Sequence, residues 1–112
     1  GDILPDSHPS KKIAKDFVVK YDKVYGNNTA NQFAGHAYDA MLVMEKAVPI
    51  ALKKAKPGTK EFRAALRDAF EQIGKTTLAH GVLNWTPTDH WGYTDDTGVM
   101  MRVTGGEFKV EK

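Results

Sequence analysis

The side chains that could do chemistry fall in two places, one near residue 31 and one between residues 80 and 90. The second place holds His80, Asp89 and His90, residue types that bind metal ions or move protons. The two histidines are ten positions apart, the chain has no cysteine, and the stretch TPTDH is a typical turn sequence. We therefore expect no metal and no cofactor here, and the sequence leaves the roles of His80 and His90 open.

The sequence contains no pattern that indicates an enzyme. Ser7 and Ser10 lie in an opening stretch with two prolines, and no hydroxyl, histidine and acid can be assembled into a nucleophilic site. Neither a glycine-rich phosphate loop nor a dinucleotide-binding fingerprint is present. We expect no catalytic residue, and an enzyme is the least favoured function class.

The first place begins with Asn31 and Gln32, at the start of a long helical stretch. Their amides could bind a ligand beside backbone N–H groups that favour a carboxylate. Helix capping explains these two residues at least as well, so both interpretations stay open. His36 follows on the same helix, where a lone histidine is usually structural.

Asp39 lies inside the apolar stretch AYDAMLVM. A carboxylate in such surroundings needs partners, because an unpaired buried charge is costly. We predict that Asp39 caps a neighbouring element or pairs with a basic residue. Tyr38 points to a different side of the helix from Phe33, and we expect it to pack in the core with its hydroxyl satisfied.

Three helices are predicted in the first two thirds of the chain. Ser10 can cap a helix from about Lys11 to Tyr25, where apolar residues recur at helical spacing. A second helix is predicted from near residues 29–31 to about Lys54. Pro49 predicts either a kink or a break in it, and the sequence does not choose between them.

The third helix follows the stretch KPGT, in which Thr59 can cap it, and is predicted to end at Gly74. After Gly74 the pattern changes to short runs with turn residues, such as GVLNW and TPTDHWGYTDDTG. Gly105-Gly106 between residues 99–104 and 107–111 predicts a β-hairpin. The chain should therefore be mostly α, with three helices followed by a C-terminal β-hairpin.

The second helix is apolar on nearly every side between residues 33 and 44. A helix that is apolar on all sides is normally buried on all sides. The other two predicted helices and the hairpin could pack against only two of its faces. Either the chain dimerises through this helix, or it is a piece of a larger protein whose sheet supplies the cover.

Composition narrows the function classes. The chain has 112 residues, enough for one domain, and its 41% hydrophobic and 27% charged fractions are those of a globular protein. A net charge of +2 without a basic block argues against nucleic acid as a partner. No apolar run is long enough to span a membrane, and the N-terminus does not have the pattern of a signal peptide.

The order of the motifs resembles the C-terminal third of type I periplasmic solute-binding proteins, the leucine/isoleucine/valine-binding group that feeds ABC transporters. The resemblance covers about Ile3 to Val110. It is carried by Phe17, Tyr21, Tyr25-Gly26, Phe33-Ala34, Ala37-Tyr38-Asp39-Ala40, Gly58-Thr59, Phe62-Arg63, Leu66-Arg67-Asp68, Gly81, Asn84 and Asp89-His90.

The resemblance implies that this chain is part of an α/β protein with two lobes that close on a solute. Residues 1–9 would then be an irregular N-terminal segment and 10–85 the helical part of the first lobe. Residues 86–112 would form the crossover and the C-terminal hairpin. The sheet of that lobe would cover the second helix.

The resemblance also implies a binding site at the start of the second helix. The family's aromatic residue that contacts the apolar part of the solute matches Phe33, with Gln32 and Asn31 beside it. The alternative is that Phe33 is the first core residue of a buried helix. A branched-chain or other apolar amino acid is the first expected solute, and an aromatic carboxylate the second. The implied partner is an ABC permease, and the implied location is periplasmic or extracellular.

A second function class stays open, a stand-alone helical module that dimerises or binds a protein and takes no small molecule. If residues 1–112 are all that is present, the uncovered sides of the second helix should drive self-association or exchange of elements between copies. The length of the parent open reading frame separates the two hypotheses.

Overall fold

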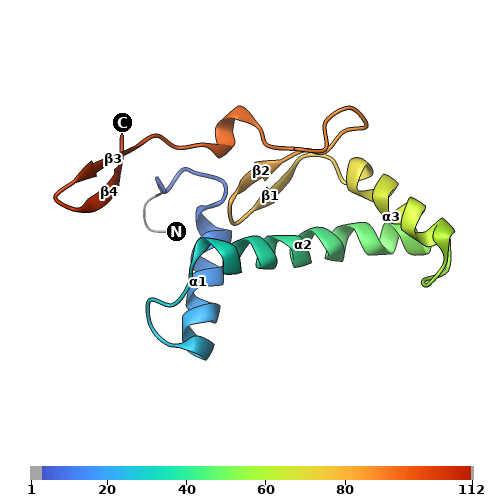
Figure 1. Cartoon of the computed structure of the whole chain (residues 1–112), viewed down its shortest axis with the longest axis horizontal. Coiled ribbons are helices and arrows are strands. Elements are labelled where there is room, and N and C mark those ends of the chain that lie inside the picture. The colour runs from blue at the N-terminus through green and yellow to red at the C-terminus, as the bar shows by residue number, and fades with distance from the viewer. Residues whose placement is uncertain (1–3, 112) are drawn as a thin grey trace.

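The computed structural model describes residues 4–111 and confirms a mostly helical chain with a C-terminal hairpin (Figure 1). A second small antiparallel hairpin, which the sequence analysis did not predict, lies between the helices and that end. In chain order the elements are α1 (Lys11–Tyr25), α2 (Gln32–Leu52), α3 (Lys60–Gln72), β1 (Thr76–Leu78), β2 (Gly81–Leu83), the 3-10 helix η1 (Asp95–Thr97), β3 (Met101–Thr104) and β4 (Glu107–Val110).

Helix α1 has the predicted bounds, but the predicted cap is wrong. Ser10 has helical backbone angles, with φ −78° and ψ −11°, so its hydroxyl caps no N–H group and is buried without a partner. The helix is held instead through Phe17, whose ring centre lies 5.5 Å from that of Tyr21 and 5.3 Å from that of Tyr38 on α2. The outer end of the predicted apolar stripe is exposed at Val24.

Helix α2 passes Pro49 without a break and ends at Leu52. Pro49 removes the donor that would bind the carbonyl of Glu45, and both residues are exposed, so that carbonyl can bind water instead. One face of the helix is buried, at Gly35, Asp39, Val43, Ala47 and Ala51. Other sides remain uncovered in this chain, with Phe33, Met41, Met44 and Leu52 exposed.

Helix α3 begins as predicted, because the Thr59 hydroxyl accepts a hydrogen bond from the N–H of Phe62 at 3.1 Å. Its buried residues are Ala65 and Ala69, small side chains that let it pack closely along α2. The helix ends at Gln72, slightly before the predicted Gly74. A small core of Val43, Leu78 and Leu83 lies where α2, α3 and the first hairpin meet.

Strands β1 and β2 form a short antiparallel hairpin along α2 (Figure 1), with Thr76 opposite Leu83 and Leu78 opposite Gly81. Ala79 and His80 form its turn. Each strand has three residues, too few for an alternating pattern to stand out in the sequence.

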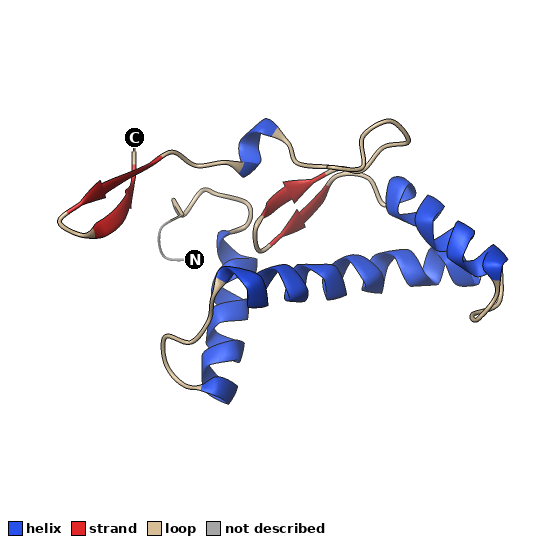
Figure 2. Cartoon of the chain, viewed as in Figure 1, coloured by secondary structure: helices blue, strands red, loops and turns tan. Residues whose placement is uncertain are grey.

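Strands β3 and β4 form the predicted C-terminal hairpin, away from the helices (Figure 2). Gly105 and Gly106 have φ values of 62° and 80°, as a two-residue turn of this kind requires. The hairpin is largely exposed on both faces. Within residues 4–111, no helix combines the length and the apolar character that crossing a membrane requires.

Candidate functional site

The three residues predicted to bind a ligand lie at the start of α2, Asn31 as its cap and Gln32 and Phe33 in its first turn, and all three are exposed. Phe33 is 85% exposed, so it is not a core residue of this chain. Asn31 caps the helix, since its side-chain oxygen accepts a hydrogen bond from the N–H of Ala34 at 3.0 Å. Asn31 and Gln32 border a cavity of about 470 Å³ that Phe33 does not line.

The loop that leads to Asn31 is organised by Asp22 on α1. Its carboxylate accepts hydrogen bonds from the N–H groups of Ala30 and Asn28, each at 3.0 Å. The bond from Ala30 is the largest cause that lowers the pKa of Asp22 below its ordinary value, and the bond from Asn28 adds to it. Asn28 also takes a left-handed conformation, with φ 60°. The approach to the first turn of α2 is therefore tied to α1.

Asp39 caps a neighbouring element, as predicted. It is 5% exposed, and its two oxygens accept hydrogen bonds from the N–H groups of Ala79 at 2.7 Å and His80 at 3.0 Å. Oδ2 also lies 3.0 Å from Nδ1 of the His80 ring. The buried carboxylate thus has three partners, and α2 is fastened to the turn of the first hairpin.

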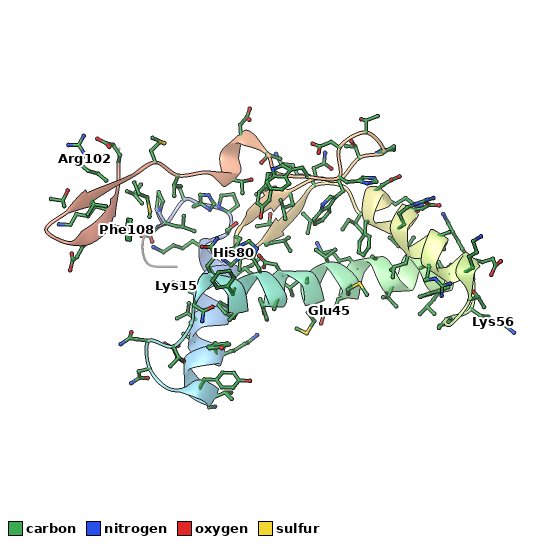
Figure 3. All side chains as sticks on the ribbon, viewed as in Figure 1. Lys15, Glu45, Lys56, His80, Arg102 and Phe108 are labelled. Carbon is green, nitrogen blue, oxygen red and sulfur yellow. The ribbon has the colours of Figure 1, made fainter. Side chains whose placement is uncertain are left out.

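The His80 ring fits against α2 at a place where the helix has no side chain (Figure 3). A Cβ atom on Gly35 would lie 2.2 Å from Cε1 of His80, so only glycine leaves room for the ring. His80 also stacks on His36, with ring centres 4.1 Å apart and ring planes 16° apart. His36 in turn lies 3.4 Å from the side-chain amide of Gln32. The two histidines therefore connect the hairpin turn to the first turn of α2.

A cavity of about 500 Å³ lies between α2, α3 and the segment from Leu83 to Tyr93. Asp39, His36 and His80 border it on the α2 side. Its remaining walls include aromatic rings from α3 and from the segment after β2. Few precisely placed polar groups on an apolar wall are typical of small-molecule sites.

The far wall of this cavity depends on a turn that Asp89 builds. Its carboxylate accepts hydrogen bonds from the N–H groups of Trp91 at 2.9 Å and Gly92 at 3.3 Å. Nε2 of His90 then lies 2.9 Å from a carboxylate oxygen of Glu71 on α3. His90 thus joins this loop to α3, and Asp89 serves as a turn residue.

Metal binding finds no support among the residues that the structure describes. His80 is bound to Asp39 and His90 to Glu71, on different sides of the cavity. Among the residues whose side chains the structure describes, no group of three or more histidine, aspartate or glutamate side chains is placed to hold a metal ion.

The sequence analysis placed the site at residues 31–33 and did not identify the cavity. The cavity depends on α2, α3 and a loop that are distant in the sequence, and no local pattern shows that they meet. Asp39 was the one available signal, because a carboxylate in an apolar helix needs partners from elsewhere in the fold.

Solved structures similar to this chain include extracellular ligand-binding receptors. One from Rhodopseudomonas palustris is 42% identical with a TM-score of 0.85, over 99% of this chain and 31% of its own. Another, from strain HaA2 of that species, is 38% identical with a TM-score of 0.86, over the same shares of the two chains. A third, also from strain HaA2, is 36% identical with a TM-score of 0.84, over 98% of this chain and 30% of its own.

This chain spans about three tenths of the length of these receptors. No protein-family model matches it, and no curated protein matches it.

Proposed function

We propose that this chain is the C-terminal part of a solute-binding receptor of an ABC importer, of the leucine/isoleucine/valine-binding group. The observation that carries the proposal is the likeness to extracellular ligand-binding receptors, 42% identical over 99% of this chain. The receptor would work outside the cytoplasmic membrane, in the periplasm or the extracellular space. Its two lobes would close on a solute and present the closed form to a membrane permease.

Within such a receptor, the chain would contribute the helical part of the first lobe with residues 10–85. Residues 86–112 would supply the crossover and the final hairpin. The segment before residue 10 is predicted to be irregular, and residues 1–3 of it, like residue 112, lie outside the described part of the chain. The exposed sides of α2 support this division, because Met41 and Leu52 are about half exposed here and the lobe's sheet would cover them.

The ligand contacts that we propose for this chain are Phe33, Gln32 and Asn31. An 85% exposed phenylalanine on the first turn of a helix is free to pack against the apolar part of a solute. The first N–H groups of α2 favour a carboxylate at the same end. The proposed solute is a branched-chain or other apolar amino acid, with an aromatic carboxylate as the second choice. The function is binding, with no catalytic residue.

The test is calorimetric titration of the complete product of the gene with L-leucine and with benzoate. We expect one of them to bind, and Phe33→Ala to weaken that binding at least tenfold, about the effect of 1.4 kcal/mol. Phe108→Ala is the matched control, because Phe108 is exposed on β4, away from α2. Binding of neither probe, or equal affinities of the two variants, would contradict the proposed site.

The 112-residue chain by itself should not bind L-leucine, because the second lobe would supply half of the cleft. Micromolar binding of L-leucine to this chain would contradict the division into two lobes. The competing hypothesis, a helical interaction module, draws its support from the exposed Met41, Met44 and Leu52. It predicts a gene product no larger than this chain and a protein partner in place of a solute.

A further inference from the structure

The two amide side chains at the start of α2 differ in how much of each is already bound within the chain. Oδ1 of Asn31 accepts a hydrogen bond from the N–H of Ala34 at 3.0 Å, and its Nδ2 lies 3.4 Å from the carbonyl oxygen of Thr29. Gln32 is bound only through its nitrogen, which lies 3.4 Å from Nε2 of His36. In the part of the chain that the structure describes, Oε1 of Gln32 has no hydrogen-bond partner.

The contact between Gln32 and His36 determines which end of the amide faces the histidine. An amide nitrogen donates hydrogen bonds and does not accept them, so Nε2 of His36 is the acceptor in this pair. The nitrogen and the oxygen of an amide lie on different sides of their shared carbon, and the Gln32 oxygen therefore faces away from His36. Gln32 is exposed, so the start of α2 presents this oxygen as an oriented acceptor.

His36 is held in place by the first hairpin. Its ring stacks on that of His80, with ring centres 4.1 Å apart and ring planes 16° apart. The His80 ring is fixed in turn by Asp39, whose Oδ2 lies 3.0 Å from its Nδ1, and by Gly35, which leaves it room on the helix. Asp39 is 5% exposed, so this anchor is shielded from water. The orientation of the Gln32 amide therefore depends on a buried carboxylate, through two stacked rings.

An oriented, uncharged acceptor favours a solute group that carries a donor. We propose that His36 is a positioning residue of the solute site, which holds the Gln32 nitrogen and turns the oxygen toward an ammonium or N–H group of the solute. The proposal rests on the proposed function, because it takes Gln32 as a contact of the bound solute. An amide already held in one orientation loses less conformational freedom when the solute binds, and this raises the affinity.

The experiment compares two solutes that differ only in the amino group, L-leucine and 4-methylpentanoate. Calorimetry with the complete product of the gene measures both affinities, and their ratio is the amine preference. We expect L-leucine to bind at least roughly tenfold more tightly, because hydrogen bonds to charged groups are the stronger ones. Gln32→Met keeps the length of the side chain and removes the acceptor, so it should lower the amine preference roughly tenfold. Gln72→Met is the matched control, since Gln72 is exposed at the end of α3.

His36→Phe tests the positioning itself. Phenylalanine keeps a flat ring that can stack on His80 but has no nitrogen to hold the Gln32 amide, so the amine preference should fall roughly three- to tenfold. In a Gln32→Met background the same substitution should lower the preference no further, because His36 acts through Gln32. A merely structural change at His36 would weaken the binding of both solutes alike. An unchanged preference in His36→Phe, or equal falls in the two backgrounds, would overturn the proposal.

A second measurement separates this proposal from the proposed function and requires no variant. In the solute-free receptor, NMR should show nuclear Overhauser contacts between the NH2 protons of Gln32 and the ring of His36. Their absence would overturn the positioning even where L-leucine binds. A receptor that binds benzoate and not L-leucine would keep the proposed function and overturn the role of Gln32 toward an amino group. Binding of none of the three solutes would contradict the proposed function, and the contact of Gln32 with a solute along with it.

Discussion

The carboxylate of Asp39 binds both the backbone N–H and the ring of His80, 41 residues further along the chain. The bond joins the middle of α2 to the turn of the first hairpin and is largely shielded from water, with the Asp39 side chain 7% exposed. The same contact fixes the tautomer of His80 and completes one wall of the cavity. A single residue of the apolar helix therefore positions both the hairpin and the cavity.

Asp39→Asn should destabilise the chain by about 1–3 kcal/mol, because the new amide group would face N–H donors that then lack an acceptor. Urea unfolding measures the change. Asp16→Asn is the control, since Asp16 is exposed on α1, and it should change the free energy of unfolding by less than about 0.5 kcal/mol. Equal effects of the two substitutions would show that the buried carboxylate does not hold the hairpin.

Gly35→Ala should also destabilise the chain, although alanine is the better helix former. The added Cβ would lie 2.2 Å from the His80 ring, and overpacking costs about 1–3 kcal/mol against a helix-propensity gain of about 1 kcal/mol. Gly98→Ala is the control, because a Cβ at Gly98 meets no atom within 4 Å.

The cause of the Gly35 effect can be isolated in a His80→Ala background. There the clash is gone, so Gly35→Ala should become neutral or stabilising. If Gly35→Ala stabilises the chain that still has His80, the packing described for this ring is wrong.

Asp22 should make the loop before α2 sensitive to acid. Its pKa in the folded chain lies below the ordinary value of 3.8, chiefly because it accepts a hydrogen bond from Ala30. The stabilisation is therefore complete above pH 3.8 and is lost as the pH falls through the lower folded pKa. The amide signals of Ala30 and Asn28 should shift together in that acid range and stay constant toward neutral pH.

Asp22→Asn tests the same linkage. Its unfolding free energy should fall below that of the unchanged chain at neutral pH, and the difference should shrink as both are acidified through the pKa. A difference that grows on acidification would contradict the sign of the shift.

The uncovered sides of α2 should make the isolated chain self-associate, and Met41, 51% exposed, lies on them. Light scattering at high concentration should show species larger than 12.4 kDa, and Met41→Asp should return them toward the monomer. Ala64→Asp adds the same charge at an exposed position on α3 and should leave the association unchanged. A chain that stays monomeric at high concentration would count against an uncovered interface.

Local patterns in the sequence predicted much of the fold. The bounds of α1, the cap at Thr59 and the turn at Gly105-Gly106 depend on neighbouring residues, and the structure confirms them. The cap at Ser10 failed because that residue has helical backbone angles, and its side chain makes no capping hydrogen bond.

Features that depend on distant residues were predicted less well. Strands β1 and β2 are short, and their burial against α2 has no local signature. The cavity likewise requires three segments to meet. Asp39 is the intermediate case. Its position in an apolar stretch of sequence predicted that the carboxylate needs a partner, but only the fold shows that the partner is the turn at residues 79–80.

The central claim is that this chain is part of a larger two-lobe receptor, and the intact mass of the gene product tests it most directly. Mass spectrometry of the product expressed from the complete gene should give about three times the 12.4 kDa of this chain, since the chain spans 31% of the receptors that it resembles. A mature product of 12.4 kDa would leave no second lobe to close the cleft, and it would contradict the receptor function in favour of a helical interaction module.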